Sequence, residues 1–282
     1  MNNKLIHSFY SEKCNEFNMF MYSCYFTLSC LYVVHSGGNI SIHTDSKFAE
    51  LIDSCPYKNI YVDLDNCYEA PRKFFAYAKL KALEKEPLGT IHIDGDVFLK
   101  DKSTIDLLNF SEYDCIVQHL ELRSHPLDIR VWDHSTLCFN NTEYPYYMNR
   151  ACNKMYNCGV LAFNNEELFK EWHDNYFRML NEFICRPDNI SDYAIPDIII
   201  EQQSLTDLCD YKNYKVKTLL HGDTHLDISL YADKIYYQHI VGDKMEYLVM
   251  CLQDIKKLSK SHYEEIKSKW EEKYPIYFKY VV

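Results

Sequence analysis

The sequence carries little positive charge and few glycines. It holds 30 Lys and Arg residues against 41 Asp and Glu residues, which gives a formal net charge of -11. Because nucleic-acid phosphates are recognised by a concentrated basic surface, this balance argues against broad nucleic-acid binding, and an anionic ligand would need a local basic exception. Among the 7 glycines, none forms a glycine-rich phosphate loop after the first predicted strand.

The cysteines show neither metal-binding nor redox spacing. There are 12 of them, scattered over the chain without a C-x-x-C pair, and no secretory signal stands in front of them. Zinc modules and thioredoxin-like chemistry both need spacings that are missing here. We therefore expect reduced thiols in a cytoplasmic protein.

Long apolar runs are also scarce. Residues 18–35 form the one segment that suggests a membrane span or a signal sequence. Asn18, Ser23, Thr27 and Ser29 interrupt it, and no basic stretch precedes it as in a signal peptide. We expect a buried amphipathic helix there and no transmembrane segment, while a peripheral association with a membrane is left open.

Strand and helix signals alternate along the first hundred residues. With 282 residues, 47% of them apolar, the chain can bury a full core. No repeat, low-complexity segment or Gly/Ser linker divides it, which favours one domain. Expected strands cover 4–10, 39–44, 60–64 and 90–93, and expected helices cover 16–35, 45–54 and 71–86. This order predicts an α/β fold with a mostly parallel, Rossmann-like sheet flanked by helices.

The rest of the chain continues this pattern around one long segment without periodicity. Residues 120–150 are rich in His, Asn, Pro and Tyr and are expected to form a loop or lid. A polar turn at Asn157 and Gly159 is expected to lead into the strand that follows. The other expected elements are strands at 115–118, 156–164 and 215–220, helices at 103–110, 165–185 and 196–209, and a helical tail at 247–273.

Two carboxylates follow the predicted buried strand at 90–93. Asp94 and Asp96 flank Gly95, whose backbone is expected to take a conformation that other residues resist. In an open α/β sheet, ligands bind outside the carboxyl ends of the strands. Paired carboxylates there suit Mg²⁺ or Mn²⁺, which takes its remaining ligands from water and substrate phosphates. The alternative is a surface turn, because Asp-Gly is a common turn dipeptide.

Four short motifs in order resemble those of glycosyltransferase family 8, whose members have the GT-A fold. Asp94-Gly95-Asp96 matches D-x-D, residues 157–160 (Asn-Cys-Gly-Val) resemble N-A-G-V, Glu201-Gln202 is similar to D-Q, and residues 239–244 (His-Ile-Val-Gly-Asp-Lys) resemble H-x-x-G-x-x-K. Two departures stand out: the last lysine comes one residue early, and Lys79 occupies a position where the family often has arginine.

The resemblance implies one GT-A-like domain over residues 1–282. A nucleotide-binding half would cover about 1–119, an acceptor and metal-completing half about 120–245, and a C-terminal helical tail about 246–282. It also implies that Asp94, Asp96 and His239 hold Mn²⁺ or Mg²⁺.

The resemblance further assigns residues to the donor. Lys244 and Lys79 would hold the diphosphate, and the Gly242 backbone would let it approach, with Gly95 beside it. His7 and Tyr10 end the first strand, where the nucleobase usually sits in this fold.

Contacts to the transferred sugar are assigned to three polar residues. Asn157 would touch its hydroxyls, and Glu201 and Gln202 would lie beneath it as catalytic residues, with Glu201 stabilising an oxocarbenium-like centre.

Each of these residues has a plain structural alternative. His239 could be a hydrogen-bonded core histidine, and Asn157 could only shape a turn. Glu201, Gln202 and Lys79 could lie on solvated helix faces, which is the common fate of such residues.

The sequence thus predicts a metal-dependent glycosyltransferase, hexosyltransferase-like, of the kind that serves polysaccharide biosynthesis. It would move a sugar from a nucleotide-sugar donor, with a UDP-linked donor favoured, to a saccharide or other hydroxyl acceptor. The resemblance to family 8 favours retention of configuration, in line with the lack of a further carboxylate clearly placed as the base that an inverting enzyme needs. A metal-dependent phosphoesterase, a sugar nucleotidyltransferase and a non-catalytic nucleotide- or sugar-binding protein of the same fold are the alternatives.

Overall fold

The computed structural model describes most of the chain. It covers residues 4–11, 14–67, 75–122, 154–184, 197–222, 225–235, 237–239 and 244–273. The remainder, including most of the predicted loop at 120–150, lies outside the described residues.

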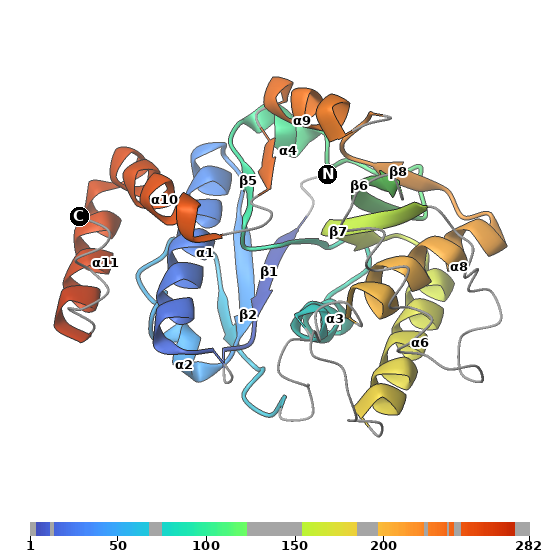
Figure 1. Cartoon of the computed structure of the whole chain (residues 1–282), viewed down its shortest axis with the longest axis horizontal. Helices are drawn as coiled ribbons and strands as arrows, with labels where there is room; N and C mark the ends of the chain where they lie inside the picture. The colour runs from blue at the N-terminus through green and yellow to red at the C-terminus, as the bar shows by residue number, and fades with distance from the viewer. Residues whose placement is uncertain are drawn as a thin grey trace. The chain divides into compact units, whose positions relative to one another are not determined.

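The protein has a seven-stranded sheet with helices around it (Figure 1). The strand order is β3-β2-β1-β4-β7-β6-β8. β1 pairs in parallel with β2, β2 with β3 and β6 with β8, whereas β6 and β7 are antiparallel. The predicted fold class, α/β with a mostly parallel sheet flanked by helices, is confirmed. The strands are β1 (Leu5–Phe9), β2 (Ile40–Thr44), β3 (Ile60–Val62), β4 (Ile91–Ile93), β6 (Cys115–Leu122), β7 (Lys154–Phe163) and β8 (Val216–Thr218).

The helices follow the predicted order; α1 has the predicted bounds, several others are shorter, and α9 was not predicted. They are α1 (Glu16–His35), α2 (Ser46–Ala49), α3 (Ala76–Glu84), α4 (Lys102–Asp106), α6 (Glu166–Ile184), η1 (Ile199–Gln203), α8 (Ser204–Lys212), α9 (His225–Lys234), α10 (Lys244–Leu258) and α11 (Lys260–Lys273). α2 and α4 each form little more than one turn. For the helix expected at 71–86, residues 71–74 lie outside the described residues and α3 begins at Ala76.

Two compact units can be recognised, each built from several chain segments. The α1 unit comprises residues 4–67, 93–107 and 232–282, and the α6 unit comprises residues 68–92 and 108–231. The proposed functional halves and tail stay a prediction.

The α1 unit is built around its longest helix. α1 begins after Asn15, whose Oδ1 accepts a hydrogen bond from the Asn18 backbone N–H at 2.8 Å, and it ends before Gly37, which has φ of +80°. One side of α1 packs on β2 and α2 through Ile42 and Phe48. Another side packs on α10 and α11 (Figure 1).

Two predictions about helices of the α1 unit are corrected by the structure. α1 was expected to be amphipathic, but it is not, because neighbouring elements cover most of its circumference. Its length and composition would allow it to cross a membrane, but 72% of its most apolar window is buried inside the protein. The tail is two helices, α10 and α11, interrupted at Ser259, and their buried residues Leu248 and Trp270 belong to the core.

The α6 unit joins strands β6, β7 and β8 to helices α3, α6 and α8 (Figure 1). α6 begins after Asn165, whose Oδ1 accepts a hydrogen bond from the Leu168 backbone N–H at 3.0 Å. β6 extends to Leu122, so the first residues of the predicted loop are strand. β7 begins at Lys154, which puts Asn157 inside a strand and not in a turn before it.

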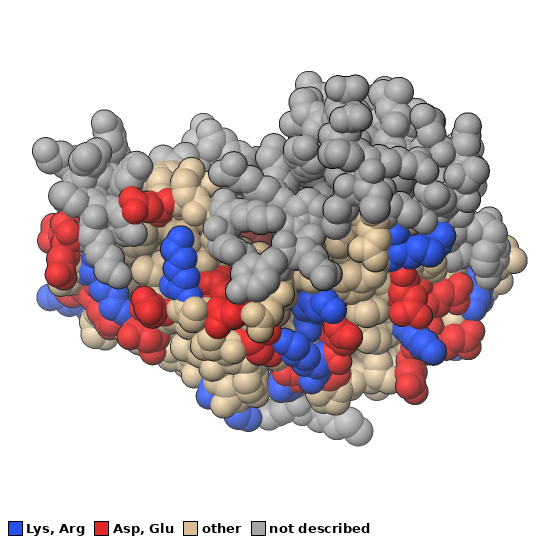
Figure 2. Space-filling model, turned by 90° about the horizontal axis from the view of Figure 1, so that it is seen from below, with Lys and Arg blue, Asp and Glu red and all other residues tan. Residues whose placement is uncertain are grey.

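One face of the described part of the protein mixes charges of both signs (Figure 2). On the face drawn in Figure 2, Lys and Arg side chains are interspersed with Asp and Glu. This mixture differs from the concentrated basic surface that nucleic-acid binding requires.

Candidate metal centre and donor site

The turn after β4 presents the two predicted carboxylates. β4 ends at Ile93, and β5 (Val97–Leu99) begins directly after Asp96. The Val97 backbone N–H donates to the Asp94 carbonyl oxygen at 3.0 Å, which closes the turn around Gly95. Both carboxylates therefore belong to one short turn of the α1 unit.

A two-stranded sheet brings the predicted third ligand to this turn. β9 (Tyr237–His239) pairs antiparallel with β5, and His239 stands opposite Val97. The pairing places His239 beside the first residue of β5, and the turn that carries Asp96 ends there, so the two side chains can meet. This pairing explains how residues so distant in the sequence share one site.

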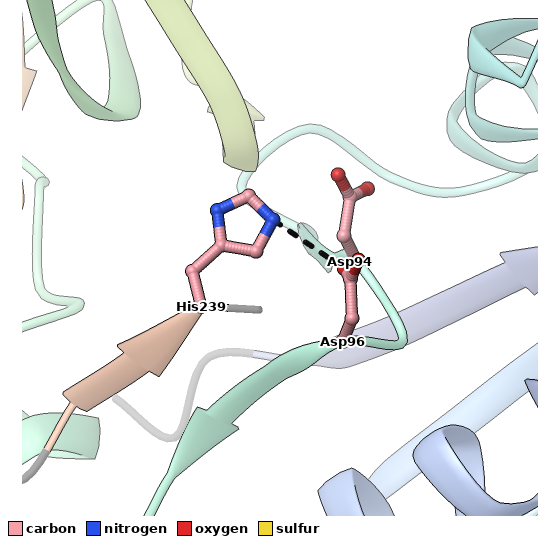
Figure 3. Close-up of side chains that lie close together, drawn as sticks. All are labelled: Asp94, Asp96 and His239. Atoms are coloured by element: carbon pink, nitrogen blue, oxygen red, sulfur yellow. Dashed lines mark ion pairs between the residues drawn. The ribbon is translucent and has the colours of Figure 1, made fainter. Parts of the chain in front are cut away.

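The three side chains form a compact donor set (Figure 3). One ligand atom from each of Asp94, Asp96 and His239 lies within 4.8 Å of the others. His239 Nε2 is 3.4 Å from Asp96 Oδ1, and these side chains are 14% and 10% exposed. Two carboxylates and an imidazole are a ligand set that Mn²⁺ accepts readily and Mg²⁺ less so.

Buried polar atoms around the set support a bound group. The Tyr237 hydroxyl and His239 Nδ1 are buried and have no hydrogen-bond partner among the described residues. Burial and the nearby charges of Asp94 and Asp96 raise the pKa of Tyr237. Because buried polar groups are normally satisfied, a ligand that completes this set fits the site. Tyr237 is absent from the sequence prediction, although its position two residues before His239 on a strand would have indicated it.

Gly95 is required for a different reason from the expected one. Its φ is not positive, unlike that of Gly37 or Gly89. A Cβ at Gly95 would instead lie 2.3 Å from the ring of Phe26, which α1 holds against the turn. Phe26 is 4% exposed, and its ring contacts His7 and Phe48 at centroid distances of 5.1 and 5.5 Å. The ring therefore has little room to move away.

We expect Gly95→Ala to destabilise the protein by about 1–3 kcal/mol, because the added methyl overpacks a closed aromatic cluster. It should also weaken divalent-ion binding by displacing the turn. Urea unfolding measures the first effect and Mn²⁺ titration the second. In a Phe26→Leu background the same substitution should cost less; an equal cost in both backgrounds would refute the contact with Phe26.

His7 is a buried residue of the α1 unit, and its contact with a nucleobase stays a prediction. Its Nδ1 lies 2.8 Å from the Tyr57 hydroxyl and its Nε2 lies 3.1 Å from Ser29 Oγ. Burial lowers the pKa of His7 to about 3, against the opposing charge of Asp96. The Ser29 hydroxyl in turn donates to the Val97 carbonyl oxygen at 2.7 Å. Through Ser29, His7 therefore supports the turn that carries Asp94 and Asp96.

Other predicted donor contacts are only partly described. Tyr10 follows β1, and its hydroxyl is buried without a hydrogen-bond partner among the described residues. Lys244 is the first residue of α10, and its side chain lies outside the described part, as does Gly242. The assignment of Lys244 and Gly242 to a diphosphate therefore stays a prediction.

In the α6 unit, two predicted site residues form a buried ion pair. Lys79 Nζ lies 2.7 Å from Glu201 Oε1 and 2.8 Å from the Cys158 carbonyl oxygen. The side chains of Lys79 and Glu201 are 2% and 0% exposed. The alternative of solvated helix faces is therefore wrong for both. Lys79 is engaged with Glu201 and with the Cys158 carbonyl oxygen, and its contact with a diphosphate stays a prediction.

The segment around Glu201 is a π-helical turn and not regular α-helix. η1 covers Ile199–Gln203, and the Trp172 indole N–H donates to the Glu201 carbonyl oxygen at 2.9 Å. Gln202 is also buried, at 9% exposure, so a solvated face is wrong for it too. π-turns inside helices are frequent at functional sites, because they shift side chains out of the helical repeat.

Asn157 shapes a bulge inside β7. The pairing of β6 and β7 shifts register between Val117 and His119, which frees the backbone at Cys158. Asn157 Oδ1 accepts a hydrogen bond from the Gly159 backbone N–H at 3.0 Å. The Cys158 carbonyl oxygen thereby turns to Lys79. The bulge thus joins two of the predicted motifs within the α6 unit.

Two polar residues beside Asn157 were not singled out from the sequence. The Asn157 side-chain amide donates to Glu121 Oε1 at 2.7 Å, and His119 Nε2 lies 3.5 Å from the same oxygen. They lie at residues 119–121, at the edge of a segment whose composition suggested only a loop.

The fold and these residues define an α/β protein in which two carboxylates and one imidazole lie close enough together to bind a single metal ion. Residues 4–282 match a family described as a family of unknown function (DUF6734), and the chain belongs to this family. No curated protein matches the sequence.

Solved structures with a similar fold include two sugar transferases. A galactosyltransferase, LgtC, in complex with donor and acceptor sugar analogues is 15% identical, with a TM-score of 0.46 over 91% of this chain and 96% of its own. Mouse xyloside xylosyltransferase 1 is 11% identical, with a TM-score of 0.42 over 77% and 85% of the two chains. These likenesses are too distant to argue function, which rests on the residues of this chain.

Proposed function

We propose that the protein is a metal-dependent glycosyltransferase that uses a nucleotide-sugar donor, UDP-linked in the first instance. The observation that carries the proposal is the convergence of Asp94, Asp96 and His239 within 4.8 Å. This donor set follows a strand of a mostly parallel α/β sheet, where ligands of such sheets bind. The order of the D-x-D motif and the other three motifs along the chain also supports a glycosyltransferase.

The metal-binding residues have a defined task in this proposal. Asp94, Asp96 and His239 would hold Mn²⁺ or Mg²⁺, and such an ion neutralises the charge that develops on a diphosphate leaving group. Lys244 and the Gly242 backbone would contact the same diphosphate. These residues supply the local exception that an acidic chain needs to bind an anion.

The sugar-binding residues belong to the α6 unit. Gln202 and half-buried Asn157 would contact the hydroxyls of the transferred sugar, and the Lys79–Glu201 pair would hold the π-turn that presents Gln202. The acceptor is a saccharide or another hydroxyl compound. Retention of configuration is part of the proposal and can be read from the anomeric proton coupling of the product.

The competing activities differ in what they need. A metal phosphoesterase usually has a second metal set of His and Asp, and the described residues contain only one such cluster. A non-catalytic protein of the same fold would bind donor and metal without turnover.

Thermal unfolding with nucleoside diphosphates tests the proposal. We expect UDP and Mn²⁺ together to raise the melting temperature, with a much smaller effect of either alone, because each completes the other's binding site. The absence of a shift for every nucleoside diphosphate with Mn²⁺ would overturn the proposal. A panel of nucleotide sugars, followed for slow hydrolysis, then identifies the donor, and turnover of simple phosphomonoesters instead would favour the phosphoesterase.

A further inference from the structure

The α6 unit buries two carboxyl groups and one ammonium group close together. Glu201 and Lys79 form the ion pair described above, and Asp197 is also fully buried, at 0% exposure. Asp197 stands four residues before Glu201, at the start of the same helical segment. All three side chains are buried.

Asp197 links three elements by hydrogen bonds. Its Oδ2 accepts from the Ala76 backbone N–H, the first of α3, at 2.9 Å. The residue before α3, Phe75, provides no side-chain cap, so Asp197 takes that task from a distant position. Its Oδ1 lies 2.7 Å from the hydroxyl of Tyr176 on α6. Asp197 therefore joins α3, α6 and the segment that carries Glu201.

Among the described residues, the charges around Asp197 balance if it holds a proton. The described titratable groups that act on it are Tyr176 from α6, Glu201 from η1 and Lys79 from α3. Lys79 neutralises Glu201, and an ionised Asp197 would leave one buried negative charge without a cation from the described part of the chain. In line with this count, burial and then the charge of Glu201 raise the pKa of Asp197 to about 8, although Ala76, Tyr176 and Lys79 oppose the shift.

We propose that Asp197 is a positioning residue which, as a neutral carboxylic acid, clamps α3 and α6 to the π-turn and so holds Glu201 and Lys79 in place. Loss of its proton at alkaline pH would place a buried negative charge beside Glu201, and this repulsion and burial cost, rather than a lost hydrogen bond, would weaken the clamp. The consequence for sugar binding, through Gln202 on the same π-turn, rests on the proposed function. The clamp itself does not depend on that function.

The dependence on pH has a definite sign. Because the folded-state pKa of Asp197 lies above the unfolded value of 3.8, its protonation stabilises the folded protein fully below pH about 4. This contribution is lost as the pH rises from about 4 to about 8. Asn mimics the neutral acid, since it keeps an acceptor for Ala76 and gains a donor for Tyr176. Ala keeps neither hydrogen bond.

The test compares Asp197→Asn, Asp197→Ala and the parent protein by thermal unfolding at several pH values. We expect the melting temperature of Asp197→Asn to gain on the parent by about 5 °C or more between pH 4.5 and 8.5. Asp197→Ala should be the least stable at acidic pH. A constant difference between Asp197→Asn and the parent at all pH values, or an Asn variant as unstable as the Ala variant, would overturn the proposal.

A spectroscopic and a kinetic readout separate positioning from simple packing. The infrared carboxylic-acid C=O band of the parent at pH 7 should disappear in Asp197→Asn, and its persistence would contradict the proton assignment. Donor hydrolysis by the parent should fall above pH 8 and that of Asp197→Asn should not. If the UDP and Mn²⁺ shift is absent while the first two results hold, the proposed function fails and the clamp stands.

Discussion

Lys79→Met is expected to destabilise the protein by about 3–5 kcal/mol, because it leaves the Glu201 carboxylate buried without its cation. Glu201 is 0% exposed, so water cannot replace the lost ammonium group. The Cys158 carbonyl oxygen loses its hydrogen bond in the same step. Methionine fills nearly the same volume, which keeps the cavity term small. Urea unfolding at neutral pH measures the loss.

The same helix offers a matched control. Lys81 also pairs with a glutamate, Glu84, at 3.1 Å, but both side chains are partly exposed, at 29% and 46%. Lys81→Met should therefore change stability by no more than about 0.5 kcal/mol. Combining Lys79→Met with Glu201→Gln should recover much of the loss, because no unpaired charge remains. Equal stabilities of the two lysine variants would contradict the buried pair.

Asp96→Asn is expected to lower metal-dependent hydrolysis of the nucleotide-sugar donor by about 10³-fold or more. Asp96 is the carboxylate nearest to His239, and an amide in its place is a neutral and much weaker ligand. The fold should be preserved, because relief of the repulsion between Asp94 and Asp96 offsets the loss of the contact with His239. Steady-state release of the nucleoside diphosphate measures the effect.

An exposed aspartate of the same unit serves as the control. Asp106, at the end of α4, is solvent-exposed, and Asp106→Asn removes the same charge from the α1 unit without touching the cluster. It should leave hydrolysis within about twofold. Comparable losses in the two variants would indicate a general charge effect and remove Asp96 from the site.

The sequence predicts the architecture well, because its local signals agree with the fold. The glycines after residue 35 end α1, the apolar triplets at 91–93 and 97–99 form β4 and β5, and the carboxylates fall in the turn between them. His239 lies next to Asp96 because β9 pairs with β5. The resemblance of residues 239–244 to the family motif predicts the same neighbourhood without knowledge of the pairing.

Other features depend on contacts that no local pattern encodes. The role of Gly95 comes from the ring of Phe26 across the unit, and the burial of His7 comes from Tyr57 and Ser29. The conformational freedom of glycine therefore did not predict the role of Gly95, and the position of His7 near a strand end did not predict its burial.

The buried pair was missed for the same reason. A helix lysine such as Lys79 is usually solvated, and only the bulge at Cys158 and the π-turn at Glu201 enclose it. Asp197 lies four residues from Glu201, but its cap on Ala76 is a tertiary contact that the sequence does not reveal.

Calorimetric titration of Mn²⁺ in the presence of UDP tests the central claim most directly. The account predicts one Mn²⁺ bound per chain, with higher affinity when UDP is present. It further predicts loss of this binding in Asp96→Asn and its retention in Asp106→Asn. Absence of Mn²⁺ binding in the parent protein, or equal binding in Asp96→Asn, would contradict a metal centre at Asp94, Asp96 and His239.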